Sequence, residues 1–161
     1  MTQITVGMGD LQVSADPNAS LVTYALGSCI AVVVYDHVRR AGGMIHYMLP
    51  HSSVTPEKAL ARPAMFADTG VPLLFEKMYG FSCRKSDLIV KVVGGANIND
   101  ENGTFEIGRR NYVMLRKMFW KVGVAVVAED VGGSASRTTR LYLATGKTTV
   151  RRSDEPIEVE L

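Results

Sequence analysis

Residues 21–35 have the sequence LVTYALGSCIAVVVY, in which two apolar runs are interrupted by Gly-Ser-Cys. Apolar runs that are rich in β-branched residues and broken by glycine are typical of two strands joined at a tight corner. We therefore predict strands over Leu21–Ala25 and Ile30–Tyr35. The corner between them consists of Gly27, Ser28 and Cys29.

Further short strands are expected on both sides of this corner. Gln3–Val6 and Leu11–Val13 are candidates before it, and Ala41–Met48 follows it until Pro50 ends the series. Residues His51–Pro63 are polar and contain two prolines, which predicts a mobile loop.

The spacing of the apolar residues changes in the second half of the chain. A first helix is predicted by apolar residues that recur at helical spacing, namely Ala64, Ala67, Val71, Leu74 and Met78. Pro72 predicts a kink or a late start in this helix, and Gly80 is a plausible stop. A second helix is expected from about Arg109 to Lys121, with Gly123 as its terminator.

The remaining predicted elements are strands. They cover Leu88–Val93, Val124–Ala128 and a hairpin of Arg140–Ala144 with Lys147–Arg151, turned at Thr145-Gly146. An order of strands, helix, strand, helix, strand and hairpin excludes regular β/α alternation and predicts an α+β fold. We expect layered mixed sheets with two helices packed outside them, in a single domain over residues 1–161.

Composition excludes several classes of function. With 47% hydrophobic and 21% charged residues the chain is not of the disordered class, and a net charge of +2 is too small for a nucleic-acid binder. The N-terminus has no signal-peptide core, and Ile30–Tyr35 is too short to span a membrane, so we expect no membrane insertion. The two cysteines lack Cys-x-x-Cys spacing, so we predict no zinc site and a reduced, cytoplasmic protein.

The corner at Gly27-Ser28-Cys29 is where we expect chemistry. A nucleophilic thiol must be exposed at the end of a strand, with backbone N–H groups nearby for the oxyanion that develops during attack. Gly27 and Ser28 meet this need, because glycine permits a sharp corner close to the sulfur. His46, 17 residues after Cys29 on the next predicted strand, is the candidate base. Thr23 is a candidate to orient the imidazole, although the intervening turn leaves its facing open.

Structural roles compete with this interpretation. A free cysteine is more often a small buried hydrophobe than a nucleophile, and a histidine on an apolar strand is usually a core residue. His37 and His51 are rivals to His46 as the base. Cys83 is expected to be an incidental thiol in a polar stretch without a nearby histidine.

Other polar residues have two interpretations as well. Asn97 and Asn99 follow a glycine pair and are expected in a turn, the alternative being hydrogen bonds to an amide substrate. Paired arginines are expected on solvated edges, the alternative being a surface that meets an acidic protein partner. The pairs are Arg39-Arg40, Arg109-Arg110 and Arg151-Arg152.

Several motifs follow one another in a specific order. Thr23-x-x-x-Gly27-Ser28-Cys29 is followed by Gly43-Met-Ile-His46-x-Met-Leu-Pro50. After them come Lys91-Val-Val-Gly-Gly-Ala96, Ile107-Gly-Arg-Arg-Asn111, Ala128-Glu-Asp-Val-Gly-Gly133 and Thr145-Gly-Lys147. In this order the motifs resemble those of CheD, the family of chemoreceptor glutamine deamidases of bacterial chemotaxis. The resemblance extends from about Val6 to Val150, and the residues between Thr23 and Leu26 depart from it in being larger than in some relatives.

The resemblance implies an activity and a fold. It makes Cys29 the nucleophile, His46 the general base and acid, and Thr23 the group that orients His46. It implies hydrolysis of chosen glutamine side chains to glutamate on chemoreceptors (methyl-accepting chemotaxis proteins), through a thioester and without metal or organic cofactor. The implied fold is similar to the catalytic domain of cytotoxic necrotizing factor toxins.

The resemblance also implies partners. Chemoreceptors are the expected substrate, and in many bacteria the family binds a CheC-type phosphatase. The alternative function is a non-catalytic docking module that binds and regulates such a phosphatase. Arg109, Arg110 and Arg137 are candidates to contact acidic receptor side chains.

Overall fold

The computed structural model describes residues 1–97 and 106–161, and within them ten strands form two five-stranded sheets. Sheet A contains, in spatial order, β1 (Thr2–Thr5), β3 (Ala19–Leu26), β8 (Arg137–Tyr142), β9 (Thr148–Arg152) and β10 (Glu158–Glu160). Sheet B contains β2 (Asp10–Ser14), β5 (Ala41–Tyr47), β4 (Ile30–Asp36), β6 (Leu88–Gly94) and β7 (Ala128–Val131). Both sheets are mixed, because β1 is parallel to β3 and β6 is parallel to β7, whereas the other described pairs are antiparallel.

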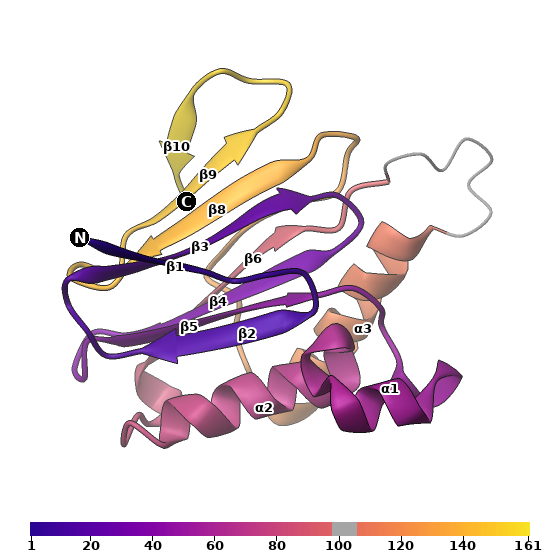
Figure 1. Cartoon of the computed structure of the whole chain (residues 1–161), viewed down its shortest axis with the longest axis horizontal. Helices are drawn as coiled ribbons and strands as arrows, with labels where there is room; N and C mark the ends of the chain where they lie inside the picture. The colour runs from indigo at the N-terminus through magenta and orange to yellow at the C-terminus, as the bar shows by residue number, and fades with distance from the viewer. Residues whose placement is uncertain (98–105) are drawn as a thin grey trace.

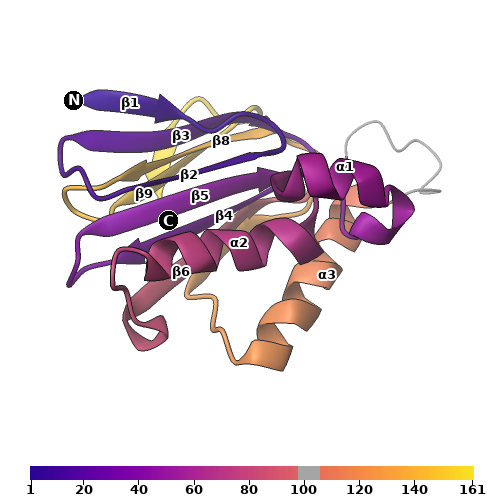
Figure 2. The same cartoon turned by 60° about the horizontal axis from the view of Figure 1, so that its bottom comes forward.

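Two long helices, α2 (Ala67–Tyr79) and α3 (Ile107–Val122), cover one face of sheet B, while sheet A covers the other face (Figures 1 and 2). The described helices are α1 (Pro56–Ala61), α2 (Ala67–Tyr79) and α3 (Ile107–Val122). Three single 3₁₀ turns lie at Ser52–Val54, Pro63–Met65 and Lys85–Asp87. The molecule therefore has three layers, in the order sheet A, sheet B and helices.

Strands β4 and β5 are central because every one of their residues is buried. Side chains alternate along a strand, so the apolar run of β4 serves two cores at once. Ile30, Val32 and Val34 pack with the helices, whereas Ala31 and Val33 pack with sheet A. A strand buried on both faces explains why the sequence here is continuously apolar rather than alternating.

The helices bury ordinary apolar stripes against sheet B. Val71, Leu74 and Met78 of α2 join the same core as Leu115 and Phe119 of α3. Pro72 lies inside α2, which begins before it at Ala67, so this proline does not set the start of the helix. Gly123 ends α3 in the left-handed conformation and donates its N–H to the carbonyl of Phe119.

The predicted α+β class with layered mixed sheets and flanking helices is confirmed. Three details are wrong. The loop predicted over His51–Pro63 contains helix α1, the strand predicted over Val124–Ala128 begins only at Ala128, and the C-terminal strand β10 was not expected. None of the helices in the described ranges is long and apolar enough to cross a membrane. Asn99 lies outside the described residues.

Candidate active site

The Gly27–Cys29 corner carries the chain from sheet A to sheet B, because β3 ends at Leu26 and β4 begins at Ile30. The segment after β6 holds this corner: Gly95 N–H donates to the Cys29 carbonyl and Ala96 N–H to the Gly27 carbonyl, each at 2.8 Å. Gly94 has φ +115°, and a Cβ there would lie 2.3 Å from the Cys29 oxygen. Glycine at position 94 is therefore required for the two segments to meet.

Thr23 and His46 meet in the space between the two sheets. Thr23 lies on β3 of sheet A, His46 lies on β5 of sheet B, and both side chains are buried. Thr23 Oγ1 is 2.7 Å from His46 Nδ1 and 2.7 Å from the carbonyl oxygen of Val6. One hydroxyl thus links the imidazole to the backbone on the opposite side of the inter-sheet space.

These two contacts fix the tautomer of His46. A threonine hydroxyl has one hydrogen, and in this geometry that hydrogen is donated to the carbonyl of Val6. The hydroxyl can then only accept from His46, so Nδ1 carries the imidazole proton. Nε2 is left with a free lone pair, and it has no hydrogen-bond partner among the described residues. His46 is therefore held with an unprotonated nitrogen available for proton transfer.

The strand register places Cys29 on the same face of sheet B as His46. Ala31 of β4 pairs directly with His46 of β5, so their side chains share a face. Cys29 precedes Ala31 by two residues and belongs to the same inter-sheet cluster. Cys29 is thus the diagonal neighbour of His46, a relation in which long or ring side chains can reach each other.

Burial sets the protonation of both groups. The thiol was expected to be exposed, but Cys29 is only 8% exposed and His46 only 1%. Burial raises the pKa of the Cys29 thiol, and the backbone N–H of Cys29 lowers it by a smaller amount. Burial also lowers the pKa of His46 to about 4. The resting pair is therefore a neutral thiol and a neutral imidazole, because desolvation disfavours the charged form of each.

The rival residues lie elsewhere. His37 follows the far end of β4, where its ring packs edge-on against Tyr35 with the ring centroids 4.9 Å apart. His51 is half-exposed, with Nδ1 3.4 Å from a carboxylate oxygen of Asp68. Cys83 lies beside Asp36, also at the far end of β4 from Cys29. His37 is thus at the opposite end of β4 from Cys29, and His51 is paired with Asp68.

Asn111 was missed as a site residue, although it ends the Ile107–Asn111 motif. It lies on α3, is fully buried, and its side-chain amide donates to the carbonyls of Ser28 and Met48. These partners are 83 and 63 residues away along the chain. A contact at such separation leaves no local pattern that sequence reasoning could detect.

The prediction that Arg137 contacts a partner's acidic side chains is wrong. Arg137 is 2% exposed, and its guanidinium is 3.1 Å from the carboxylate of Asp130 and 3.2 Å from the carbonyl of Ala135. A buried ion pair of this kind joins the ends of β7 and β8. Arg109, by contrast, is exposed, and its guanidinium lies 3.7 Å from the carboxylate of Glu106.

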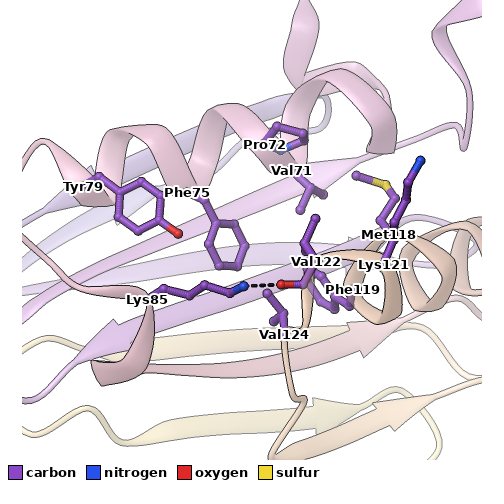
Figure 3. Close-up of a pocket in the computed structure, with 10 residues that line it drawn as sticks. All are labelled: Val71, Pro72, Phe75, Tyr79, Lys85, Met118, Phe119, Lys121, Val122 and Val124. Atoms are coloured by element: carbon purple, nitrogen blue, oxygen red, sulfur yellow. Dashed lines mark hydrogen bonds between the residues drawn. The ribbon is translucent and has the colours of Figure 1, made fainter.

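A pocket lies on the helical side of the molecule, away from the Cys29 corner. Figure 3 shows an apolar pocket of about 370 Å³ between α2 and α3, with Phe75 and Phe119 in its wall. At its edge Lys85 donates to the carbonyl of Val122. Cysteine and histidine are absent from the residues that line it. In the described part of the chain, no group of three or more His, Cys, Asp or Glu residues is arranged to hold a metal ion.

Comparison with known proteins identifies the family. Residues 48–152 match the family model described as CheD chemotactic sensory transduction. Over 155 residues the chain is 53% identical to a probable chemoreceptor glutamine deamidase, CheD 2, of Anaeromyxobacter dehalogenans, covering 96% of this chain and 98% of that one. It is 49% identical to a probable chemoreceptor glutamine deamidase, CheD 1, of Syntrophus aciditrophicus, covering 98% of each chain. The chain belongs to the CheD family.

Membership of CheD covers the whole candidate site. A third relative, a probable chemoreceptor glutamine deamidase of Solibacter usitatus, is 46% identical over 91% of this chain. The CheD family model begins at Met48, after Cys29 and His46. The alignment with the Anaeromyxobacter relative, however, covers 96% of this chain, so it includes the corner. The Cys29 corner therefore lies within the part of the chain that is similar to CheD relatives.

Proposed function

We propose that this CheD-family chain hydrolyses glutamine side chains of chemoreceptors to glutamate, with Cys29 as nucleophile, His46 as general base and acid, and Thr23 as the residue that orients His46. The substrate and the reaction are those for which the CheD relatives are named, as chemoreceptor glutamine deamidases. The observation that carries the mechanism is the hydrogen bond between Thr23 Oγ1 and His46 Nδ1, since it leaves Nε2 free on the face that Cys29 shares.

The first half of the reaction forms a thioester. His46 Nε2 takes the thiol proton as the Cys29 sulfur attacks the carbonyl carbon of the glutamine side chain. The oxyanion that forms is stabilised by backbone N–H groups at Ser28 and Cys29, each worth about 3 kcal/mol of barrier. The imidazolium then returns its proton to the amide nitrogen, the carbon–nitrogen bond breaks, and ammonia leaves.

The second half releases the product. Neutral His46 removes a proton from a water molecule, and the resulting hydroxide attacks the thioester carbonyl. The carbon–sulfur bond breaks, the sulfur recovers the proton from His46, and the receptor side chain departs as glutamate. The sum is one amide and one water converted to one carboxylic acid and one ammonia, so the step needs no redox partner.

The exposed side of α3 supports an acidic receptor surface as the docking partner. The helix sequence contains five basic residues and no acidic one. Arg109, Arg110 and Lys117 line a groove of about 430 Å³, in which Glu106 is the acidic residue. The same helix carries Asn111, which contacts Ser28 at the corner, so α3 contributes to both the groove and the proposed site. A run of positive charge at this position favours association with acidic helices.

A second partner is favoured by the apolar surface at the end of α3. Trp120 is 88% exposed and Val122 55%, and Tyr79 stands at the pocket drawn in Figure 3. Large exposed aromatic residues are enriched where proteins meet. We assign this surface to a CheC-type phosphatase, so that Trp120→Ala should weaken that binding and leave deamidation unchanged.

The test of the reaction is mass spectrometry of receptor peptides after incubation with wild-type protein and with Cys29→Ala. Wild-type protein should add the small mass difference between an amide and an acid to selected glutamines, with release of ammonia. Cys29→Ala should bind receptor and leave the peptides unchanged. Ammonia release by the variant would remove the proposed mechanism, and binding without any wild-type turnover would favour the docking-module alternative.

A further inference from the structure

We infer that Asn111 is a positioning residue that aligns the backbone of the Cys29 corner with the strand of His46. The inference rests on the proposed function, since it names what holds the two reacting segments in register. The supporting observation is that one nitrogen atom donates two hydrogen bonds. Asn111 Nδ2 donates to the carbonyl oxygen of Ser28 at 2.9 Å and to that of Met48 at 3.0 Å.

Each acceptor is next to a reacting residue. Ser28 directly precedes Cys29, and Met48 follows His46 by two residues. The β4–β5 ladder, which begins at Ile30 and Tyr47, also joins the corner to the strand. Asn111 therefore ties together the two segments just beyond the end of the ladder, where sheet hydrogen bonds no longer set their distance.

The bond to Ser28 also fixes the direction of a backbone donor. The peptide bond is planar and trans, so the Cys29 N–H points opposite to the Ser28 carbonyl in the same plane. With that carbonyl held by Asn111, the N–H is turned toward the reacting side of the corner. The same N–H lies against the Cys29 sulfur, where its hydrogen bond favours the thiolate. Asn111 thus sets the donor that the oxyanion needs without touching the substrate.

Asn111 is itself held firmly. Its own carbonyl accepts a hydrogen bond from Tyr47 Oη at 2.7 Å, and Tyr47 is fully buried beside His46 on β5. From the other side, Gly95 and Ala96 hold the corner through their N–H groups. The corner is therefore fixed from two directions, by the end of β6 and by α3.

The residue type supports a role beyond packing. A primary amide is the smallest side chain that can give two hydrogens from one nitrogen to two carbonyls. Among the described residues nothing donates to the amide oxygen Oδ1, which is buried. An apolar side chain of similar shape would avoid leaving this oxygen unsatisfied, but it would remove the donor that the carbonyls of Ser28 and Met48 share.

The test compares Asn111→Leu with Leu115→Ala, made in a Cys83→Ala background so that Cys29 is the one thiol. Leu115 lies one turn later on α3, is fully buried, and packs in the helical core. Asn111→Leu should lower kcat for receptor deamidation by roughly 10- to 100-fold with KM nearly unchanged, since an oxyanion donor acts only in the transition state. The pH midpoint for alkylation of Cys29 by iodoacetamide should also move upward. Leu115→Ala should reduce stability and leave kcat and the midpoint unchanged.

Two further variants keep the inference open to contradiction if Asn111→Leu fails to fold. Asn111→Gln, which keeps both donors, should recover part of kcat, and Tyr47→Phe, which removes the bond to the Asn111 carbonyl, should lower kcat by a smaller factor. Equal kcat per folded molecule for the Asn111 variants and Leu115→Ala would overturn the inference. The alkylation midpoint is independent of receptor turnover, so an upward shift without any deamidation by wild-type protein would contradict the proposed function alone.

Discussion

Cys29 and Cys83 are almost equally buried, at 8% and 6% exposed, yet their surroundings differ in kind. Cys29 lies at the corner between the sheets, on the face of sheet B that carries a neutral imidazole with a free nitrogen. Cys83 lies between α2 and β6 beside Asp36. Burial, followed by the hydrogen bond to Asp36 and the charge of that carboxylate, raises the pKa of this thiol to about 12. The exposed fraction therefore does not distinguish the proposed nucleophile from the other thiol, whereas their neighbouring side chains differ. A base can accept the proton from Cys29, and an ionised carboxylate keeps the proton on Cys83.

Removing the proposed base, His46, should cause the largest loss of activity. His46→Ala should lower kcat for receptor deamidation by about 10³-fold, because general base catalysis supplies that order of acceleration. His37→Ala, a change to a histidine at the far end of β4, should leave kcat within about twofold, since a surface group away from the reaction makes no transition-state contact. Ammonia release under saturating receptor measures both. A larger loss of kcat for His37→Ala than for His46→Ala would contradict the assignment of His46 as the base.

Removing the group that orients His46 should have the next largest effect. Thr23→Val keeps the shape of the side chain and removes the hydroxyl that joins Val6 to the imidazole. The imidazole then loses its fixed tautomer, and kcat should fall by roughly 10- to 100-fold, in line with the tautomer-orienting role of partners to catalytic histidines. Thr139→Val is the matched control. Thr139 lies on β8 directly opposite Thr23 of β3 and is fully buried. Its hydroxyl donates to the carbonyl of Thr149.

Both valine variants should unfold more easily, and only Thr23→Val should lose activity. Each leaves a buried carbonyl without its donor, which costs about 1–3 kcal/mol. The measurements are the free energy of unfolding in urea and kcat. Equal losses of activity for the two variants would indicate that the hydroxyl of Thr23 contributes to the fold and not to the reaction.

Stability should respond to pH through His46. The pKa of His46 is lowered to about 4 in the folded protein, below its ordinary value of 6.5, because burial disfavours the imidazolium. The unfolded chain therefore takes up a proton that the folded chain does not, and the free energy of unfolding falls as pH decreases from 6.5 to 4, by about 3 kcal/mol. Above pH 6.5 this contribution is complete. Urea unfolding of wild-type protein and of His46→Gln across this range measures it, and an identical slope in the two proteins would assign the loss to other groups.

The smallest expected effect is a difference in the rate of alkylation between the two thiols. At pH 8 iodoacetamide should modify Cys29 at least about tenfold faster than Cys83, because a carboxylate neighbour suppresses the thiolate and a backbone donor favours it. Peptide mapping after partial modification gives both rates in one sample. Asp36→Asn should reduce the difference between the two alkylation rates. Faster labelling of Cys83 than of Cys29 in wild-type protein would contradict the prediction.

The sequence predicted the inner part of the fold better than its edges. The strand Ile30–Tyr35 was found because a strand buried on both faces leaves an unbroken apolar run, and the end of the strand Ala41–Met48 was marked by Pro50. Helix α1 was missed because all its residues lie at the surface, and β10 because its sequence, Glu-Val-Glu, is exposed and paired only with β9. Strand β7 was placed too early because its register comes from parallel pairing with β6, a contact that composition does not encode.

The candidate site was predictable where its chemistry is local. The corner at Cys29 follows from glycine and strand propensity, and the meeting of Thr23 with His46 was an expectation of the family resemblance. The burial of the thiol was not foreseen, since it depends on how two sheets close over a corner. The contacts of Asn111 with Ser28 and Met48 join three separate parts of the chain, and only the folded structure brings them together.

Whether Cys29 forms a thioester with the receptor glutamine can be tested by trapping that intermediate. Wild-type protein mixed with a receptor peptide for less than one turnover and quenched in acid should carry the peptide on Cys29, with a mass equal to the sum of the two minus ammonia. Digestion and sequencing by mass spectrometry locate the adduct. An adduct on Cys29 that is absent in Cys29→Ala is the predicted result. Deamidated peptide without any adduct on Cys29, or an adduct on Cys83, would contradict the account.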